Sequence, residues 1–163
     1  LSGPSTCRVI DGDVREEVLA KLGPDPLAGG KKAEVRKAVR ASKKPIAALL
    51  LDQSVIAGVG NIFRAEILFE AGLDPNTPGV ELSDAGFDRL WRVLVKQMKT
   101  GLKYGKIVTV TAKEAGRPLA KLDGNERFRL YGHDECPRCD GPIETPEVAS
   151  RRLYVCPRCQ IRS

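Results

Sequence analysis

The stretch LLLDQSVIAGVGNI, residues 49–62, decides the fold, because two glycines interrupt an apolar helical pattern that continues on both sides. Upstream, apolar residues recur at helical spacing over Ser42–Leu51, whose first residue is a candidate N-cap. Downstream, the pattern resumes over Ile62–Ala71. Gly58 and Gly60 therefore predict a tight turn between two helices.

The predicted turn has the chemistry of an anion site. Glycines adopt positive φ and let the backbone approach another molecule closely. The helix that begins at Ile62 presents unpaired N–H groups and the positive end of its dipole, so a phosphate is the natural ligand. Asn61 could add a side-chain donor. Gly58, Gly60 and Asn61 are therefore candidate phosphate-binding residues. The alternative is a helix boundary with Asn61 as its cap.

Four of the five cysteines form two pairs near the C-terminus, Cys136/Cys139 and Cys156/Cys159, with 16 residues between the pairs. This spacing is typical of a four-cysteine zinc site. Two tight knuckles can place four sulfurs ~2.3 Å from one ion, which fills the tetrahedron and makes the zinc structural. Two redox-active pairs are the alternative, but the surrounding α/β pattern is missing. The one histidine, His133, is interpreted as a surface residue and not a ligand.

Residues 141–155, between the knuckles, should form a β-hairpin that the metal pins at its base. Arg151 and Arg152 then lie near the tip or on the returning strand. Two adjacent arginines can simply aid solubility. A rigid hairpin, however, can also push a tip residue into a groove of another molecule.

The rest of the chain is predicted to be mainly helical. Ser83 is a candidate cap for a long helix, and Asp13 for the first one. The expected fold is mainly α, with two helices that flank the glycine turn, followed by a C-terminal four-cysteine zinc-finger β-hairpin. The remaining predicted elements are helices at Asp13–Leu22, Lys31–Ala41 and Ser83–Leu102, a β-rich segment at Ile107–Thr111, a loop at Ala112–Asn125 and a short strand at Arg127–Tyr131.

Composition limits the partners. The 163 residues include 27 Lys and Arg against 21 Asp and Glu, a net charge of +6 that permits a polyanionic partner without requiring one. The basic run over residues 31–44 is either a solvated face or a phosphate-facing surface. The sequence contains no run of about 18 apolar residues, so it predicts no membrane-spanning helix. The odd number of cysteines argues against a disulfide scaffold and suits a reducing compartment.

Residues 49–62, continuing through Arg64-Ala65-Glu66-Ile67-Leu68, resemble the helix–two-turn–helix of the bacterial DNA glycosylases that include formamidopyrimidine-DNA glycosylase and endonuclease VIII. The cysteine module followed by Gln160 resembles their C-terminal zinc finger. Both occur in the family's order and spacing, and the resemblance covers roughly residues 13–160. The words LLLDQ and RAEIL are more similar to endonuclease VIII than to the formamidopyrimidine enzyme.

The resemblance implies base-excision repair, in which an oxidised base is removed and the strand is cleaved by β,δ-elimination. Oxidised pyrimidines are favoured over purines. Asn61 matches the family's phosphate-binding asparagine, and Arg151 the hairpin arginine that contacts the phosphate flanking the damaged nucleotide. Arg152 lies where the family varies and receives no role. The implied partner is double-stranded DNA with a damaged base or abasic site, kinked, with the base turned out. A monomer in the bacterial cytoplasm, at the nucleoid, is expected.

The start of the sequence departs from the family. The family's nucleophile is an N-terminal proline, followed by glutamate, on a β-sandwich domain; its amine forms a Schiff base with the sugar. This chain begins Leu1-Ser2-Gly3. We therefore expect that this chain contains no catalytic residue and that the Pro-Glu pair lies upstream of Leu1. We also expect that the chain binds DNA without excising a base. The expected divisions are the end of the sandwich (1–12), the helical DNA-binding domain (13–105), a linker (106–126) and the zinc finger (127–163).

Two other interpretations remain at this point. One is a non-enzymatic nucleic-acid-binding zinc protein of the ribosomal or transcription-factor type, which would prefer structured RNA over abasic duplex DNA. The other is a purely structural zinc protein, whose affinity for any nucleic acid would not fall with salt.

Overall fold

The structure is a computed structural model that describes residues 12–29 and 31–161. The predicted strand end at Leu1–Ile10, and Cys7 with it, lie outside the described residues. The predicted fold class is confirmed: helices are followed by one small antiparallel hairpin. The elements are α1 (Gly12–Ala20), α2 (Lys32–Arg40), α3 (Ile46–Leu49), α4 (Asn61–Ala71), α5 (Asp84–Tyr104), α6 (Ala112–Ala115), the 3-10 turns η1 (Gly79–Glu81), η2 (Leu119–Lys121) and η3 (Gly124–Arg127), and the strands β1 (Glu147–Val148) and β2 (Arg151–Arg152).

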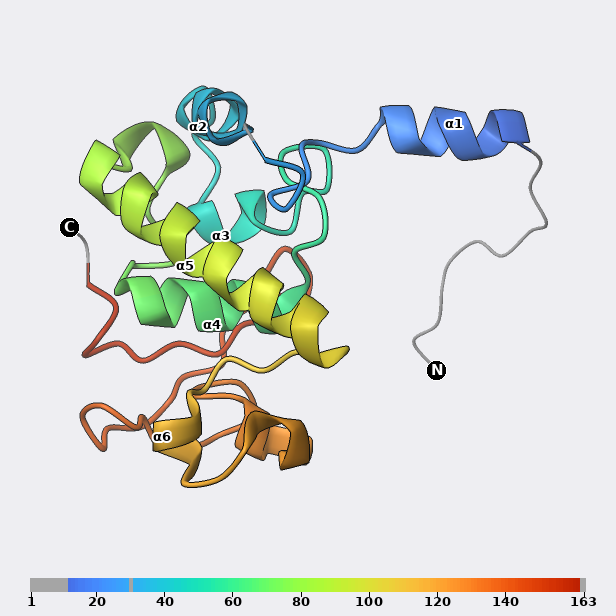
Figure 1. Cartoon of the computed structure of the whole chain (residues 1–163). Helices are drawn as coiled ribbons and strands as arrows, with labels where there is room; N and C mark the ends of the chain where they lie inside the picture. The colour runs from blue at the N-terminus through green and yellow to red at the C-terminus, as the bar shows by residue number, and fades with distance from the viewer. Residues whose placement is uncertain (1–11, 30, 162–163) are drawn as a thin grey trace.

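Helix α4 lies at the centre and packs along the longer α5 (Figure 1). Almost every residue of α4 after its first two is buried, including the polar Arg64 and Glu66. Helix α5 begins as predicted, because the Ser83 hydroxyl accepts a hydrogen bond from the N–H of Gly86 at 3.1 Å. It turns a buried apolar face, which includes Phe87, towards the core. None of the helices in the described ranges has the length and apolar character that crossing a bilayer requires.

The basic run pairs largely with acids of the same chain. Arg36 on α2 bonds both Asp84 and Asp88 at the start of α5. Lys32 lies 2.6 Å from Asp88, and Arg40 lies 3.4 Å from Asp84. This pairing favours the solvated-face interpretation over a phosphate-facing surface for α2. Exposed pairs of this kind each contribute only about 0–1 kcal/mol to stability.

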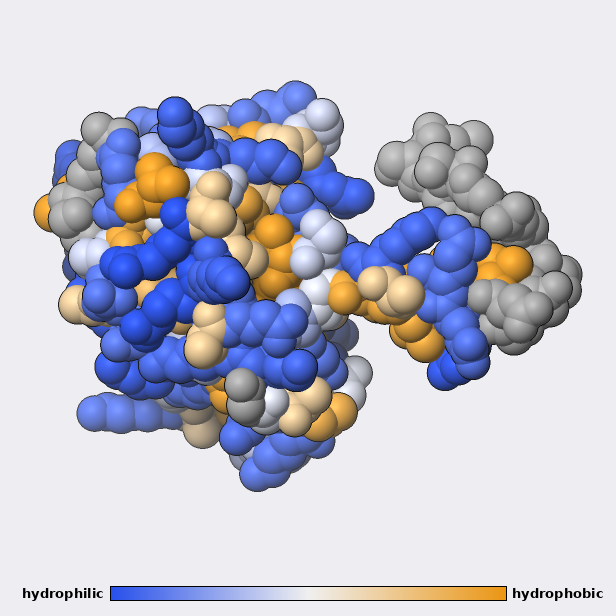
Figure 2. Space-filling model, turned by 90° about the horizontal axis from the view of Figure 1, so that it is seen from above, coloured by the Kyte–Doolittle hydropathy of each residue, from blue (hydrophilic) through white to orange (hydrophobic). Residues whose placement is uncertain are grey.

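Helix α1 stands away from the body of the molecule (Figures 1 and 2). The helix itself was predicted, but it begins at Gly12, so Asp13 lies within it and is not its N-cap. Apolar residues recur on this helix at helical spacing, but most of them are not buried against the rest of the described chain. Val18, Leu19 and Leu22 are 51%, 48% and 41% exposed, respectively, and hydrophobic residues are visible on this helix in Figure 2.

Helix α3 is shorter than the predicted Ser42–Leu51. It begins only after Pro45, whose extended backbone (ψ 143°) forms the N-cap. A proline disfavours helical geometry in the residue before it, so the helix cannot extend back through Lys44. The Ser42 hydroxyl instead accepts from the N–H of Lys44 within the turn at 3.2 Å.

Residues 107–131 also differ from the prediction. No strand forms at Ile107–Thr111 or Arg127–Tyr131, although the N–H of Thr109 donates to the carbonyl of Arg127 at 2.8 Å. The predicted loop between them holds α6, η2 and η3. Two capping boxes start α6 and η3, at Thr111/Glu114 and Asp123/Glu126, which satisfy the N–H groups of each first turn.

The buried carboxylate of Glu66 explains why residues 129–131 do not join a sheet. It accepts hydrogen bonds from the N–H groups of Arg129, Leu130 and Tyr131 at 2.7–3.0 Å. It also accepts one from the hydroxyl of Thr109 at 2.6 Å. The donors that a neighbouring strand would use are therefore occupied by a side chain of α4.

Replacing Glu66 with glutamine should destabilise the chain by about 1–3 kcal/mol. The new amide NH2 would face backbone donors, and the buried pocket would lose its charge-assisted hydrogen bonds. Urea unfolding of the variant beside the parent measures this. Glu16→Gln, on the exposed α1, is the matched control and should change stability by less than ~0.5 kcal/mol. Equal losses of stability in Glu66→Gln and Glu16→Gln would contradict the role assigned to the Glu66 carboxylate.

Candidate nucleic-acid interface

The side chain of Gln53 shapes the glycine turn. Its amide NH2 donates to the carbonyls of Val59, at 2.9 Å, and Leu51, at 3.2 Å. Its carbonyl oxygen accepts from the N–H of Gly58 at 2.9 Å. The segment before α2 supports the turn from outside, because the N–H of Gly23 donates to the carbonyl of Gln53 at 2.7 Å. The turn is thus held from both sides.

The two glycines have different reasons to be glycine. Gly58 has φ +84°, and a Cβ there would lie 3.0 Å from the Cε of Met98. Gly60 is the N-cap of α4 at an ordinary φ of −105°, with no heavy atom within 4 Å of the position its Cβ would take. A side chain at Gly60 would therefore begin in open space. The first intrahelical bond is from the N–H of Arg64 to the carbonyl of Gly60, which leaves the earlier N–H groups without a helical acceptor.

Asn61 does not cap the helix, so the interpretation of this residue as a cap is wrong. It is the first residue of α4, and no side chain caps that end. Its Nδ2 donates to the carbonyl of Arg152 at 2.9 Å, and its Oδ1 accepts from Nη2 of Arg64 at 2.5 Å. Asn61 therefore joins the start of α4 to the returning strand of the hairpin.

The hairpin has the predicted form near its tip. Strands β1 and β2 pair antiparallel, with Val148 opposite Arg151. The two residues at the tip, Ala149 and Ser150, both have positive φ, 54° and 56°, as a two-residue type I′ turn requires. Arg151 follows the tip directly and is exposed. The prediction that Arg151 and Arg152 lie near the tip or on the returning strand is confirmed, because both residues form β2.

The glycine turn and the hairpin tip meet in one place, which is positively charged. Between α3 and the tip is a groove of about 430 Å3 whose lining includes Lys44 and Arg151. Lys44 lies 3.5 Å from Asp52. Within residues 12–29 and 31–161, no ion pair involves Arg64, Arg151 or Arg152, although Glu147 lies opposite Arg152 across the hairpin, so the guanidinium of Arg151 is available to bind an anion. Such a surface suits a polyanion.

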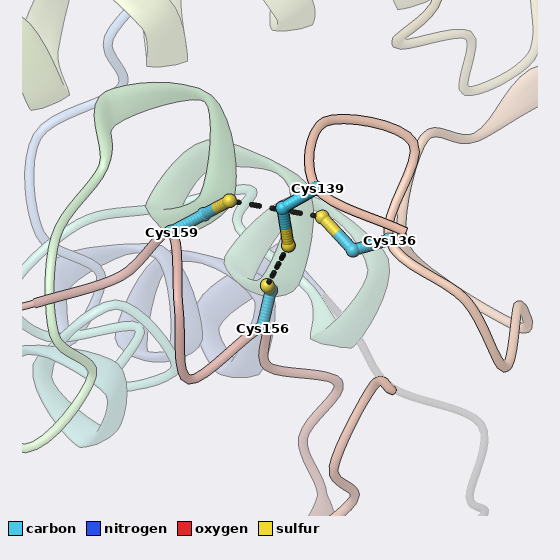
Figure 3. A group of neighbouring side chains, drawn as sticks. All are labelled: Cys136, Cys139, Cys156 and Cys159. Carbon is cyan, nitrogen blue, oxygen red and sulfur yellow. Dashed lines mark hydrogen bonds between the residues drawn. The ribbon is translucent and has the colours of Figure 1, made fainter. Parts of the chain in front are cut away.

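The four paired cysteines converge on one point (Figure 3). Their sulfurs all lie within 4.8 Å of one another, with Cys136 to Cys159 at 3.8 Å and Cys139 to Cys156 at 3.5 Å. A tetrahedron with Zn–S bonds of ~2.3 Å has edges of ~3.8 Å, so the four sulfurs fit zinc. All four positions are filled by protein, which makes the site structural. His133 lies outside this cluster, with its Nε2 3.1 Å from the carbonyl of Asn125.

Both knuckles are fastened to the far end of α4. The guanidinium of Arg138 donates to the carbonyl of Phe69 at 2.9 Å and stacks over that ring at 4.2 Å. From the second knuckle, Gln160 donates to the carbonyl of Leu73 at 3.2 Å and accepts from the N–H of Cys156 at 2.9 Å. The zinc therefore positions the hairpin relative to α4.

Sequence reasoning missed three residues that build this site: Gln53, Arg64 and Glu66. All three lie in the stretch that carries the family resemblance, but the sequence assigned them no structural role. Charged residues two positions apart, inside an apolar helical run, were the available signal for Arg64 and Glu66, because buried charges need specific partners. No local signal marked Gln53.

Substituting Cys156 with serine should release the zinc and disorder the hairpin, because structural zinc contributes directly to folding. Metal content by mass spectrometry and thermal unfolding measure both effects. Cys7→Ser is the control, since four thiolates already complete the tetrahedron, and it should keep one zinc per chain. A Cys156→Ser chain that retains zinc as the parent does would refute the four-cysteine assignment.

Known proteins share both parts of this architecture. Residues 22–113 match the family described as the formamidopyrimidine-DNA glycosylase H2TH domain, and residues 134–161 match the zinc finger found in FPG and IleRS. The second match, together with the sulfur cluster, shows one structural zinc ion. The predicted cofactor is thereby confirmed.

Individual relatives agree. The chain is 39% identical over 163 residues to endonuclease 8 1 of Mycobacterium tuberculosis, covering 98% of this chain and 61% of that protein. It resembles the crystal structure of MutM (Fpg) from Thermus thermophilus with TM-score 0.76 and 35% identity, over 93% of this chain and 59% of that one.

A structure of Lactococcus lactis formamidopyrimidine-DNA glycosylase, bound non-covalently to DNA containing an AP site, matches with TM-score 0.72 and 26% identity, over 90% of this chain and 52% of that one. The chain thus spans between about half and 61% of the length of these proteins. The glycine turn that opens α4, the zinc-pinned hairpin that meets it and the match over residues 22–113 together show that the chain belongs to the formamidopyrimidine-DNA glycosylase H2TH family.

Proposed function

We propose that this chain binds double-stranded DNA at a damaged base or abasic site, as the DNA-binding part of a DNA glycosylase with AP lyase activity. The observation that carries the proposal is the meeting of Asn61 and the hairpin tip beside an un-neutralised Arg151. One stretch of sugar-phosphate backbone can contact both elements there. The Lactococcus relative is a DNA glycosylase seen bound to DNA that contains an AP site, and the mycobacterial relative is named as an endonuclease.

In this proposal each candidate residue has a separate task. Gly58 permits the turn, and Gly60 leaves room for a phosphate at the N–H groups that open α4. Asn61 donates from its amide, and Arg151 binds the phosphate flanking the damaged nucleotide by a charge-assisted hydrogen bond. Because these contacts go to the backbone, they position the duplex without reading its sequence.

The substrate preference and setting belong to the same proposal. The words LLLDQ and RAEIL resemble the sequence of endonuclease VIII. This resemblance favours an oxidised pyrimidine over an oxidised purine as the damaged base. One chain supplies both the turn and the hairpin, so the proposed form is a monomer. DNA repair in a bacterium would place it at the nucleoid. We also retain the proposed division into a helical DNA-binding part (13–105), a linker (106–126) and a zinc finger (127–163).

Replacing Arg151 with alanine should weaken binding to an abasic duplex about tenfold and reduce the slope of log Kd against log salt by about 0.9, the contribution of one phosphate contact. Fluorescence anisotropy across a salt series measures both. Arg92→Ala, an exposed cation on α5, is the matched control for loss of one charge and should leave the slope nearly unchanged.

Two outcomes would overturn the proposal. If Arg151→Ala binds abasic duplex as tightly as the parent, the hairpin is not the contact. If the parent prefers structured RNA and shows no preference for abasic over intact duplex, a non-enzymatic RNA-binding protein is the better interpretation.

DNA binding and bond breaking are proposed to be separable. Borohydride traps the Schiff base that forms between an enzyme amine and an abasic sugar. Treating the 163-residue chain and abasic duplex with borohydride should give no covalent adduct under conditions where the duplex is saturated. An adduct that maps to a residue of this chain would contradict the proposed separation.

A further inference from the structure

Arg64 links the two elements of the proposed interface. Its side chain is 0% exposed. Nη1 donates to the carbonyl of Val148 on β1 at 2.9 Å, and Nη2 donates to Oδ1 of Asn61 at 2.5 Å. Longer bonds from Nη2 reach the carbonyls of Arg151 and Arg152, at 3.3 and 3.4 Å. One guanidinium thus holds both sides of the hairpin tip and the first residue of α4.

This arginine has no counter-charge among the described residues, whereas another arginine beside α4 does. Arg129, which also bonds to α4, lies 2.8 Å from Glu70 and 2.8 Å from Glu114, and these acids outweigh its burial and raise its pKa. Burial, and then the nearby charge of Arg151, lower the pKa of Arg64 to about 10. The Nε of Arg64 is buried without a hydrogen-bond partner. A buried charge without a counter-charge and a full set of hydrogen bonds lowers the stability of the fold, unless another group supplies them.

The arrangement also fixes which way Asn61 faces. Because a guanidinium can only donate, it must face Oδ1 of Asn61, which directs Nδ2 towards the hairpin. Of the two hydrogens on Nδ2, one is donated to the carbonyl of Arg152, and the other is left for an outside acceptor. The hairpin carbonyls turn inward to Arg64, while the side chain of Arg151 is exposed.

We propose that Arg64 is a positioning residue for the DNA interface: it orients Asn61 and the hairpin tip for one backbone phosphate, and that phosphate supplies the counter-charge that Arg64 lacks in the free chain. The inference rests on the proposed DNA binding and adds a residue that acts through Asn61 and Arg151. It does not require Arg64 to touch the DNA.

A double-mutant cycle tests this inference. The variants are Arg64→Met, which keeps length but removes charge and donors, and Arg64→Lys, which keeps the charge but loses the two-pronged geometry. Each is made in the parent and in an Arg151→Ala background. The measurement is the Kd for a fluorescein-labelled abasic duplex over a salt series, with zinc content measured on every variant. Arg89→Met is the control, a half-buried arginine of α5 that donates to the carbonyl of Ala71.

Arg64→Met should weaken binding about tenfold in the parent and less than about threefold in the Arg151→Ala background, because residues that act together are not additive. Arg64→Lys should lie between the parent and Arg64→Met, and Arg89→Met should match the parent. If the Arg64→Met variant loses zinc, only the cycle built with Arg64→Lys is used to test the inference.

Equal losses in the two backgrounds, with an unchanged salt slope, would overturn the positioning role and leave Arg64 a purely structural residue. That result differs from a failure of the proposed function, in which the parent chain itself would not bind the duplex.

Discussion

The structure depends on α4 burying two opposite charges that do not pair with each other. Glu66 accepts from the backbone N–H groups of residues 129–131, while Arg64 donates to the backbone carbonyls of the hairpin. Most partners of both charges therefore lie in the C-terminal part of the chain, residues 129–131 and the hairpin, although Arg64 also bonds Asn61 on its own helix and Glu66 also bonds Thr109. Because buried charges need geometrically specific partners, the two side chains together fix both the position and the orientation of that part against α4.

The zinc site provides a second attachment between the hairpin and α4. At the far end of α4, Arg138 and Gln160 fasten the two knuckles to the backbone that follows the helix. The zinc then ties the base of the hairpin, and Arg64 ties its tip. A short two-stranded hairpin is only marginally stable alone, so its rigidity comes from being held at both ends. An exposed arginine on such a hairpin keeps a fixed position relative to the start of α4.

Local signals predicted much of this architecture, and long-range contacts decided the rest. The glycine turn, the Ser83 cap and the cysteine spacing each depend on a few neighbouring residues, and the structure confirms them. The capping box of Thr111 was equally local and was overlooked. The burial of Arg64 could not be predicted, because its hairpin partners lie 84 or more residues along the chain. The same holds for the strand predicted at 127–131, which lost its donors to Glu66.

Joint binding of one DNA strand by the start of α4 and the hairpin tip is the idea from which the functional conclusions follow. The most direct measurement is a crystal structure of the chain with a duplex containing a stable abasic-site analogue. The expected result is a phosphate within ~3 Å of both the Asn61 amide and the Arg151 guanidinium, or two adjacent phosphates of one strand that divide these contacts. A duplex bound along α2 and α5, away from the hairpin, would contradict it.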